Sequence, residues 1–192
     1  MIEQVDFYYD IVSPYSYMAA IQMAELEAET GVQVNWLPIF LGGLFKQVGN
    51  NAPLSLEAKK RYMFQEDLPR LAAAYQVPYT LPEVFPTNTL KVQRALAALP
   101  AEQRAALSLN LFDNYWGQGR DVGLPEVAEE ILGTEIAALA GEDTAKTALK
   151  DLTDQAIARG AFGAPSLFWK DQLYFGCDRV HLLKNDLLAA KG

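Results

Sequence analysis

The 192-residue sequence has little of the chemistry on which redox and metal sites depend: one cysteine, Cys177, and one histidine, His181. A single cysteine excludes an internal disulfide and an intramolecular dithiol redox cycle. One histidine and one cysteine are too few for the usual zinc ligand sets, and no loop has the carboxylate spacing of a calcium site, so we expect no metal. The low thiol content fits a reducing compartment, and we expect a cytoplasmic protein.

Long apolar runs and basic character are also missing. No stretch reaches the roughly 18 apolar residues that span a bilayer, so we expect no membrane segment. The start, MIEQVDFYYD, lacks the basic and apolar regions of a signal peptide. The formal net charge of −8 disfavours nonspecific contact with nucleic acid or anionic lipid. What is present is ordinary globular composition, with 51% hydrophobic and 21% charged residues.

The first part of the chain predicts a βαβ unit. Val5–Asp10 and Gln33–Phe40 are typical of buried strands. Between them, Ser13–Pro14 predicts a helix start, and the apolar spacing continues to about Thr30, where Gly31 is well placed to end the helix. A strand, a helix and a second parallel strand in this order form a right-handed unit.

The last part predicts a β-hairpin followed by a helix. Ser166–Trp169 and Leu173–Phe175 are short apolar runs around a polar turn, and Arg179–Ala189 is amphipathic. A βαβ half and a ββα half together make the α/β thioredoxin fold. We therefore expect residues 1–54 and 160–192 to form a thioredoxin-like domain.

Residues 55–159 show mostly helical periodicity and are expected to form a large all-helical insertion domain. The glycine-rich stretch before it, Leu41–Pro53, is expected to be a loop or a short irregular helix. The candidate helices of the insertion are Leu56–Tyr75, Asn88–Ala98, Glu102–Trp116, Pro125–Leu132, Glu135–Ala140 and Asp143–Arg159.

The turn before the first helix carries the first candidate for chemistry. Thioredoxin-fold redox proteins hold Cys-x-x-Cys at this place, whereas here both positions are serine, Ser13 and Ser16. Backbone N–H groups at a helix N-terminus favour negative charge, so they can stabilise a thiolate brought by a ligand, to which Ser13 can donate a hydrogen bond. The alternative is that Ser13 is a plain N-cap.

Two further segments are candidates for ligand contacts. Pro165 directly precedes a predicted strand, at the place where thioredoxin folds have a cis-proline; an ordinary trans proline is the alternative. A cis bond there would leave the backbone of Ala164 free to pair with an extended peptide such as glutathione. Asp178 follows Cys177 and is predicted to be a helix N-cap, a γ-glutamyl ligand, or both.

Taken together, these segments resemble the family of kappa-class glutathione transferases and bacterial 2-hydroxychromene-2-carboxylate isomerases. The matching stretches are FYYDIVSPYSYMAA, LGGLFKQVGNNAP, RYMFQEDLPRLAAAYQVPYTLPEVFPTNTL, RGAFGAPSLFW and LYFGCDRVHLL. The resemblance spans nearly the whole chain and depends on the order and spacing of the segments. It implies a DsbA-like thioredoxin fold, glutathione as cofactor and a homodimer.

The resemblance also implies roles for individual residues. Ser13 matches the serine that stabilises the glutathione thiolate, and Lys46 matches a lysine that contacts the substrate carboxylate. The implied glutathione contacts are Tyr15, Asn50, Ala164, Pro165, Cys177 and Asp178. Residues expected at the second-substrate pocket are Phe40, Phe64, Phe85 and Trp116. Cys177 replaces a residue that is usually small or polar, and a mixed disulfide between its thiol and glutathione is a hypothesis.

The expected activity is a glutathione-dependent isomerisation of a small aromatic-degradation intermediate that carries a carboxylate. A kappa-class-like glutathione transferase or peroxidase is the first alternative. A non-catalytic thioredoxin-fold binding protein is the alternative from another class. A dithiol oxidoreductase is nearly excluded because positions 13 and 16 are both serine.

Overall fold

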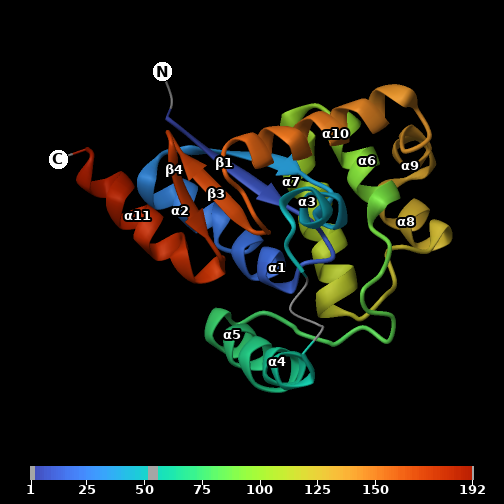
Figure 1. Cartoon of the computed structure of the whole chain (residues 1–192), viewed down its shortest axis with the longest axis horizontal. Coiled ribbons are helices and arrows are strands. Elements are labelled where there is room, and N and C mark those ends of the chain that lie inside the picture. The colour runs from blue at the N-terminus through green and yellow to red at the C-terminus, as the bar shows by residue number, and fades with distance from the viewer. Residues whose placement is uncertain (1–2, 52–55, 192) are drawn as a thin grey trace.

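The computed structural model describes residues 3–51 and 56–191, and the β-sheet lies at the centre of this part of the chain (Figure 1). The strands are β1 (Gln4–Tyr9), β2 (Gln33–Pro38), β3 (Ser166–Trp169) and β4 (Gln172–Phe175). The helices are α1 (Pro14–Ala20), α2 (Met23–Thr30), α3 (Leu41–Val48), α4 (Glu57–Tyr62), α5 (Leu68–Tyr75), α6 (Leu90–Ala98), α7 (Ala101–Phe112), α8 (Pro125–Leu132), α9 (Thr134–Leu139), α10 (Asp143–Ala158) and α11 (Val180–Ala189).

The sheet has the strand order β2-β1-β3-β4. β1 and β2 are parallel, with Val5 opposite Val34 and Phe7 opposite Trp36. β3 runs antiparallel to both β1 and β4. The predicted combination of a βαβ half and a ββα half is therefore confirmed, and the β3 limits agree with those read from the sequence.

Both faces of the sheet are covered, which explains the continuous apolar runs of the inner strands. Alternate residues of a strand point to opposite faces. Phe7 and Tyr9 of β1 lie in a core with side chains of α1, α2, α7 and α11. Tyr8, between them, lies in a second core with side chains of α3 and α10. Figure 1 shows α10 and α3 on one side of the sheet and α2 and α11 on the other.

The helix predicted from Ser13 to Thr30 is divided into α1 and α2. The amide of Gln22 lies at the division, where its Nε2 donates to Met18 O at 2.6 Å and to Cys177 O at 3.2 Å. The Gln22 side chain therefore links a backbone carbonyl of α1 to the backbone of Cys177, in the turn after β4. Gly31 ends α2 with φ of 62°, as predicted.

The middle of the chain is helical, with three differences from the predicted segments. The glycine-rich stretch after β2 forms a regular helix, α3, which ends at Gly49 with φ of 68°. The helix predicted over Leu56–Tyr75 contains a π-helical turn at Met63–Asp67. The helix predicted to end at Trp116 finishes in a second π-helical turn, Asp113–Gly117. No helix within the described residues is long and apolar enough to cross a membrane.

The middle helices are hydrogen-bonded directly to the ends of the central strands. Gln93 of α6 donates to Tyr9 O at 3.0 Å and to Ile39 O at 2.7 Å. Trp116 donates from its indole Nε1 to Ile11 O at 2.8 Å. These bonds fix the carboxyl ends of β1 and β2, where the chain turns toward Ser13. The division into a thioredoxin-like domain and a helical insertion domain stays a prediction.

Candidate functional site

Ser13 is the N-cap of α1, as the Ser-Pro pair predicted. Its φ and ψ of −88° and 115° are extended, its Oγ accepts from Ser16 N at 3.1 Å, and Pro14 occupies the first turn. A proline at this position loses no helical hydrogen bond, and a serine cap satisfies a free N–H group. Ser13 is only 5% exposed, so its hydroxyl lies in a largely desolvated position at the positive end of the helix.

The loop that contains Pro165 faces Ser13. The Ala164–Pro165 peptide bond is cis, one of the two alternatives that the sequence left open. Ser13 Oγ donates to Ala164 O at 3.0 Å, which joins two segments that are 151 residues apart in the sequence. A second cis bond, Phe85–Pro86, was not predicted, because nothing in the local sequence distinguishes it from a trans X-Pro bond.

A buried carboxylate, Asp10, fixes the turn that leads to Ser13. Asp10 is fully buried and accepts three hydrogen bonds, from Val12 N at 3.1 Å, Leu41 N at 2.9 Å and Thr89 Oγ1 at 2.7 Å. Burial outweighs these donors and raises the pKa of the carboxyl to about 6. One side chain therefore ties together the Ser13 turn, the start of α3 and the segment before α6.

Beside Ser13 lies a mainly apolar cavity of about 420 Å³. This volume is within the roughly 300–1,000 Å³ range that is typical of small-molecule sites. Its wall is built from the Ser13 turn, α3 and its C-terminal end, the Phe85–Pro86 segment, Met63, and the strand ends around Ala164. The lining residues are Val12, Ser13, Pro14, Tyr15, Leu41, Gly42, Phe45, Asn50, Asn51, Met63, Phe85, Pro86, Gly163, Ala164 and Phe175.

A second cavity of about 370 Å³ adjoins the first and is more polar. The two cavities share Tyr15, Ala164 and Phe175. The residues that line only the second cavity come from α5 and its preceding turn, from the proline loop before β3 and from the turn after β4. They are Asp67, Leu71, Pro165, Gly176, Cys177, Asp178 and Arg179.

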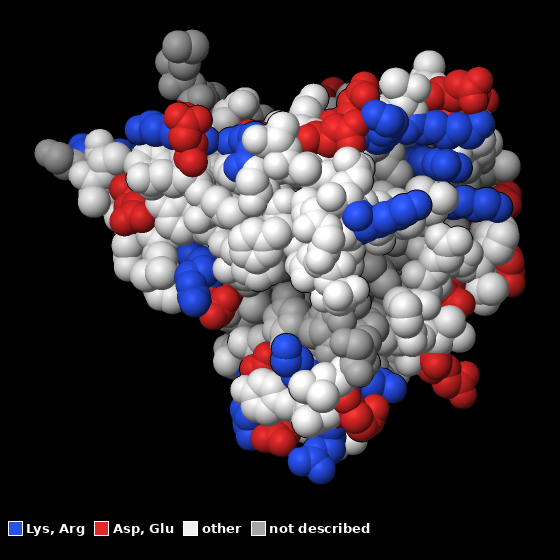
Figure 2. Space-filling view, in the orientation of Figure 1, with Lys and Arg blue, Asp and Glu red and all other residues white. Residues whose placement is uncertain are grey.

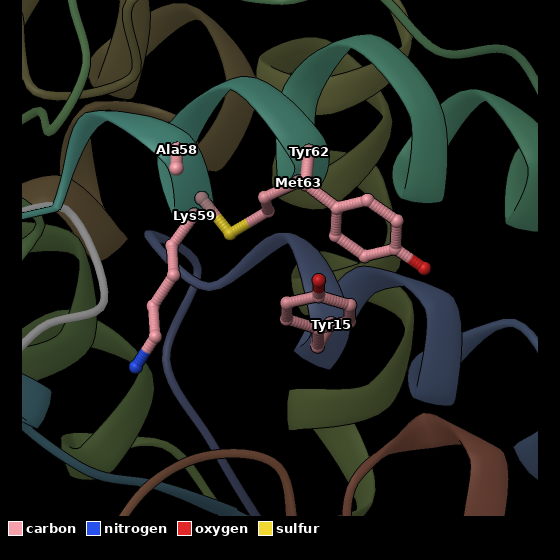
Figure 3. A pocket seen from close by; sticks show the side chains of 5 residues that line it. All are labelled: Tyr15, Ala58, Lys59, Tyr62 and Met63. Carbon is pink, nitrogen blue, oxygen red and sulfur yellow. The ribbon is translucent and has the colours of Figure 1, made fainter.

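Tyr15 lies where the cavities meet. Its hydroxyl donates to Asp67 Oδ2 at 2.7 Å, and both burial and this carboxylate raise the pKa of the phenol above its ordinary value. Tyr15 also lines a third pocket of about 390 Å³ with Ala58, Lys59, Tyr62 and Met63 (Figure 3). In that view α4 lies across the pocket from the Tyr15 ring, and Lys59 extends its amine along one edge.

The turn after β4 places one thiol and one carboxylate at the polar cavity. Cys177 is 3% exposed, and burial, followed by the charges of Asp178 and Asp67, raises the pKa of its thiol to about 12. The Asp178 carboxylate is exposed and pairs with the Arg179 guanidinium at 2.5 Å. The prediction that Asp178 is a helix N-cap is wrong. It lies inside a short 3₁₀ turn, Cys177–Arg179, and Arg179 precedes α11 without a side-chain cap.

The remaining predicted contacts are placed as follows. Asn50 lines the apolar cavity, and its Nδ2 donates to Phe162 O at 2.8 Å. Lys46 is exposed on α3 and is not among the residues that line either cavity. Of the aromatic residues expected at the pocket, Phe85 lines it, while Phe64 and Trp116 pack edge-on behind Phe85 with ring centroids 5.0 and 5.4 Å away.

Phe40 does not reach this site and lines a different groove, between α3, α6 and α10. No role was assigned from the sequence to Asp10 or to Asp67. Asp10 has a local signal, because it directly follows a buried apolar strand. Asp67 reaches the polar cavity only through tertiary packing, which no local pattern reveals.

These features define a thioredoxin-fold protein in which the N-terminus of the first helix faces a cis-proline loop and carries serines where redox members have cysteines. The chain matches the family model of the DSBA-like thioredoxin domain over residues 4–188. It therefore belongs to the DsbA-like thioredoxin family, and the fold expected from the sequence is confirmed.

Known proteins of similar sequence are enzymes. A 2-hydroxychromene-2-carboxylate isomerase from Sphingobium xenophagum is 33% identical over 199 residues, which cover 98% of this chain and 100% of the relative. A glutathione S-transferase kappa 1 from Caenorhabditis elegans is 28% identical, with 97% and 91% of the two chains covered. A solved structure of a 2-hydroxychromene-2-carboxylate isomerase has a TM-score of 0.86 at 28% identity, with 97% and 95% covered. The resemblance to both groups is confirmed, and the chain is an enzyme.

Proposed function

We propose that this enzyme is a glutathione-dependent isomerase that acts on a small aromatic-degradation intermediate of the 2-hydroxychromene-2-carboxylate type. The observation that carries the proposal is the position of the Ser13 hydroxyl, at a helix N-terminus, 3.0 Å from Ala164 O and beside the meeting point of a polar and an apolar cavity. The isomerase from Sphingobium xenophagum, 33% identical over nearly the whole chain, supports this choice.

The polar cavity has the chemistry to hold glutathione. Asp67 and Asp178 line it and offer carboxylates to the α-amino group of the γ-glutamyl end. The backbone of Ala164, beside the cis-proline, lies between the two cavities and can pair with the cysteinyl amide. We infer that Tyr15, Asn50, Pro165 and Cys177 complete the contacts. Bound glutathione would supply a thiolate that adds to a conjugated double bond and later leaves, which permits rotation about the intervening single bond.

Ser13 would hold the sulfur in its anionic form. A hydroxyl hydrogen is free to rotate, so it can turn from Ala164 O toward a sulfur that enters the cavity. Because Ser13 Oγ accepts from Ser16 N, its O–H is polarised and becomes a better donor. The helix N-terminus adds a favourable field for the negative charge.

The apolar cavity would take the second substrate. Its lining excludes water from an aromatic ring and holds the reacting carbon near the Ser13 turn. Lys46 stays our prediction for the cation that pairs with the substrate carboxylate. Lys59, which lines the third pocket beside Tyr15, is a second cation near the site. The homodimer and the cytoplasmic location also stay predictions.

A matched pair of serine variants tests the proposal. Ser13→Ala should lower turnover by about 10²-fold or more, as for a lost oxyanion-type donor, and should raise the pKa of bound glutathione. Ser16→Ala is the control, because Ser16 Oγ is buried with no hydrogen-bond partner among the described residues and should matter little. The measurements are steady-state kinetics and an ultraviolet titration of the thiolate. Equal damage from both changes, or none from Ser13→Ala, would refute the role of Ser13.

A glutathione transferase using the same site is the second candidate, supported by the kappa 1 relative from Caenorhabditis elegans. The two activities differ in whether the sulfur leaves the substrate. Parallel assays of the purified protein with hydroxychromene carboxylate and with a chromogenic aryl halide distinguish them. Faster turnover of the halide, with glutathione retained in the product, would favour the transferase.

A further inference from the structure

A further groove lies on the side of α3 that faces away from the apolar cavity. α3 contributes Leu41, Gly42 and Phe45 to the apolar cavity. It contributes Gly43 and Gln47 to a groove of about 160 Å³ between α3, α6 and α10. The groove is smaller than a typical site for a whole drug-sized ligand, roughly 300–1,000 Å³. A groove of this size can hold one charged group of a ligand, and the rest of that ligand would lie in solvent.

The groove is basic although the chain is acidic. Arg94 of α6 and Lys146 and Lys150 of α10 line it, against one carboxylate, Asp154. The whole chain has a formal net charge of −8, so the lining of the groove is more basic than the chain as a whole. Figure 2 shows Lys and Arg side chains gathered at the upper right, over the corner where α6 and α10 lie in Figure 1.

The two lysines of the groove have partners, but the arginine has none among the described residues. Lys146 Nζ pairs with Asp143 at 2.8 Å, and Lys150 Nζ pairs with Asp154 at 2.5 Å. Arg94 is half-buried, and no hydrogen bond or ion pair to its guanidinium occurs within residues 3–51 and 56–191. Arg94 lines the hollow together with these two lysines, and its guanidinium can donate to an anion from outside the chain.

We propose that this groove binds a phosphate group, either as free phosphate or as the head group of a small phosphate ester. The planar guanidinium of Arg94 matches two oxygens of a phosphate in a bidentate pair. Lys146 and Lys150 border the groove and add positive charge to it, although each already pairs with a carboxylate, Asp143 and Asp154. The proposal does not depend on glutathione or on the reaction at Ser13.

The test is a titration of the full chain, without glutathione, with inorganic phosphate at constant ionic strength, followed by calorimetry. Saturable binding is expected in the wild type, and Arg94→Gln should weaken it about tenfold or more, the loss of a charged hydrogen-bond partner. Arg94→Lys keeps the positive charge but loses the bidentate geometry of the guanidinium, so it should give an intermediate affinity. Arg70→Gln is the matched control, since Arg70 is exposed on α5 and pairs with Glu66 at 3.0 Å, and it should bind as the wild type does.

Two further titrations, with phenyl phosphate and with malonate, distinguish a phosphate ester from free phosphate and test whether the groove prefers phosphate to a dicarboxylate. Phenyl phosphate that binds more tightly than inorganic phosphate points to an ester, and the reverse order points to free phosphate. Malonate that binds more tightly than both would overturn the assignment to phosphate. No saturable heat in the wild type, or the same affinity in Arg94→Gln, would overturn the site itself. Circular dichroism confirms that each variant is folded.

Discussion

Asp10 should make the stability of this protein depend on pH in an unusual direction, and Asp10→Asn should remove that dependence. The carboxyl has a pKa of about 6 in the folded chain, against an ordinary value of 3.8, because it is fully buried. The folded state therefore binds a proton at a higher pH than the unfolded state does. The resulting stabilisation is complete below about pH 3.8 and is lost as the pH rises through about 6.

The magnitude follows from the two pKa values. One pKa unit corresponds to about 1.4 kcal/mol, so the whole shift is worth roughly 3 kcal/mol. Between about pH 7 and about pH 5 the folded chain takes up most of one proton that the unfolded chain does not, which contributes about 1 kcal/mol to the free energy of unfolding. An asparagine has no such proton. The asparagine NH₂ group would also face Leu41 N, and this backbone donor would then lack an acceptor. The loss lowers the free energy of unfolding by about 1–3 kcal/mol at every pH.

The assay is urea unfolding of the wild type and Asp10→Asn at several pH values across this range. Other groups of the chain titrate too, so the informative quantity is the difference in the free energy of unfolding between the two proteins at each pH. That difference should grow by about 1 kcal/mol as the pH falls from about 7 to about 5. Asp171→Asn, at an exposed carboxylate in the β3–β4 turn, is the control and should follow the wild-type slope. Parallel profiles for wild type and Asp10→Asn would show that burial does not govern this carboxyl.

Two further predictions concern the walls of the cavities. In Gly163→Ala the new Cβ would lie 2.9 Å from Cε2 of Phe175, so the ring must move. KM for the second substrate should therefore rise several-fold, while the pKa of bound glutathione stays the same. An unchanged KM would contradict this. Burial raises the pKa of the Cys177 thiol to about 12, so at neutral pH the thiol should react slowly with iodoacetamide in the folded chain and quickly in urea. Mass spectrometry can follow the labelling, and fast labelling of the folded chain would contradict this and support the mixed-disulfide hypothesis.

The parts of the fold that were predicted well are those with a strong local signal. The apolar run of β3, the Ser-Pro start of α1 and the glycine that ends α2 each have a direct cause in neighbouring residues. For α3 the sequence left a loop and a short irregular helix open, because its glycines favour neither clearly. Gly43 is needed there for packing, since a Cβ at this position would lie 2.9 Å from the Phe40 ring.

The candidate site was predictable where it depends on position along the fold. Ser13 and Pro165 are defined by their places before a helix and before a strand, and the structure brings their segments together. Asp67 was not predictable in this way. It reaches the polar cavity because Tyr15 binds it across 52 residues, and nothing near either residue in the sequence records that contact.

The two serines of the turn show how the same backbone can serve either redox or non-redox chemistry. Ser13 Oγ accepts one hydrogen bond and donates another, so its hydroxyl links the helix N-terminus to the proline loop. Ser16 Oγ is buried and has no partner among the described residues, although a buried unpaired hydroxyl costs roughly 1–3 kcal/mol. The groups that favour an anion at this turn are backbone N–H groups, which do not depend on the side chain at position 13. Under the proposed mechanism, the same field would stabilise a thiolate whether the chain or a ligand supplied the sulfur. The serine at position 13 would then change the source of the nucleophile and leave the backbone field that stabilises it in place.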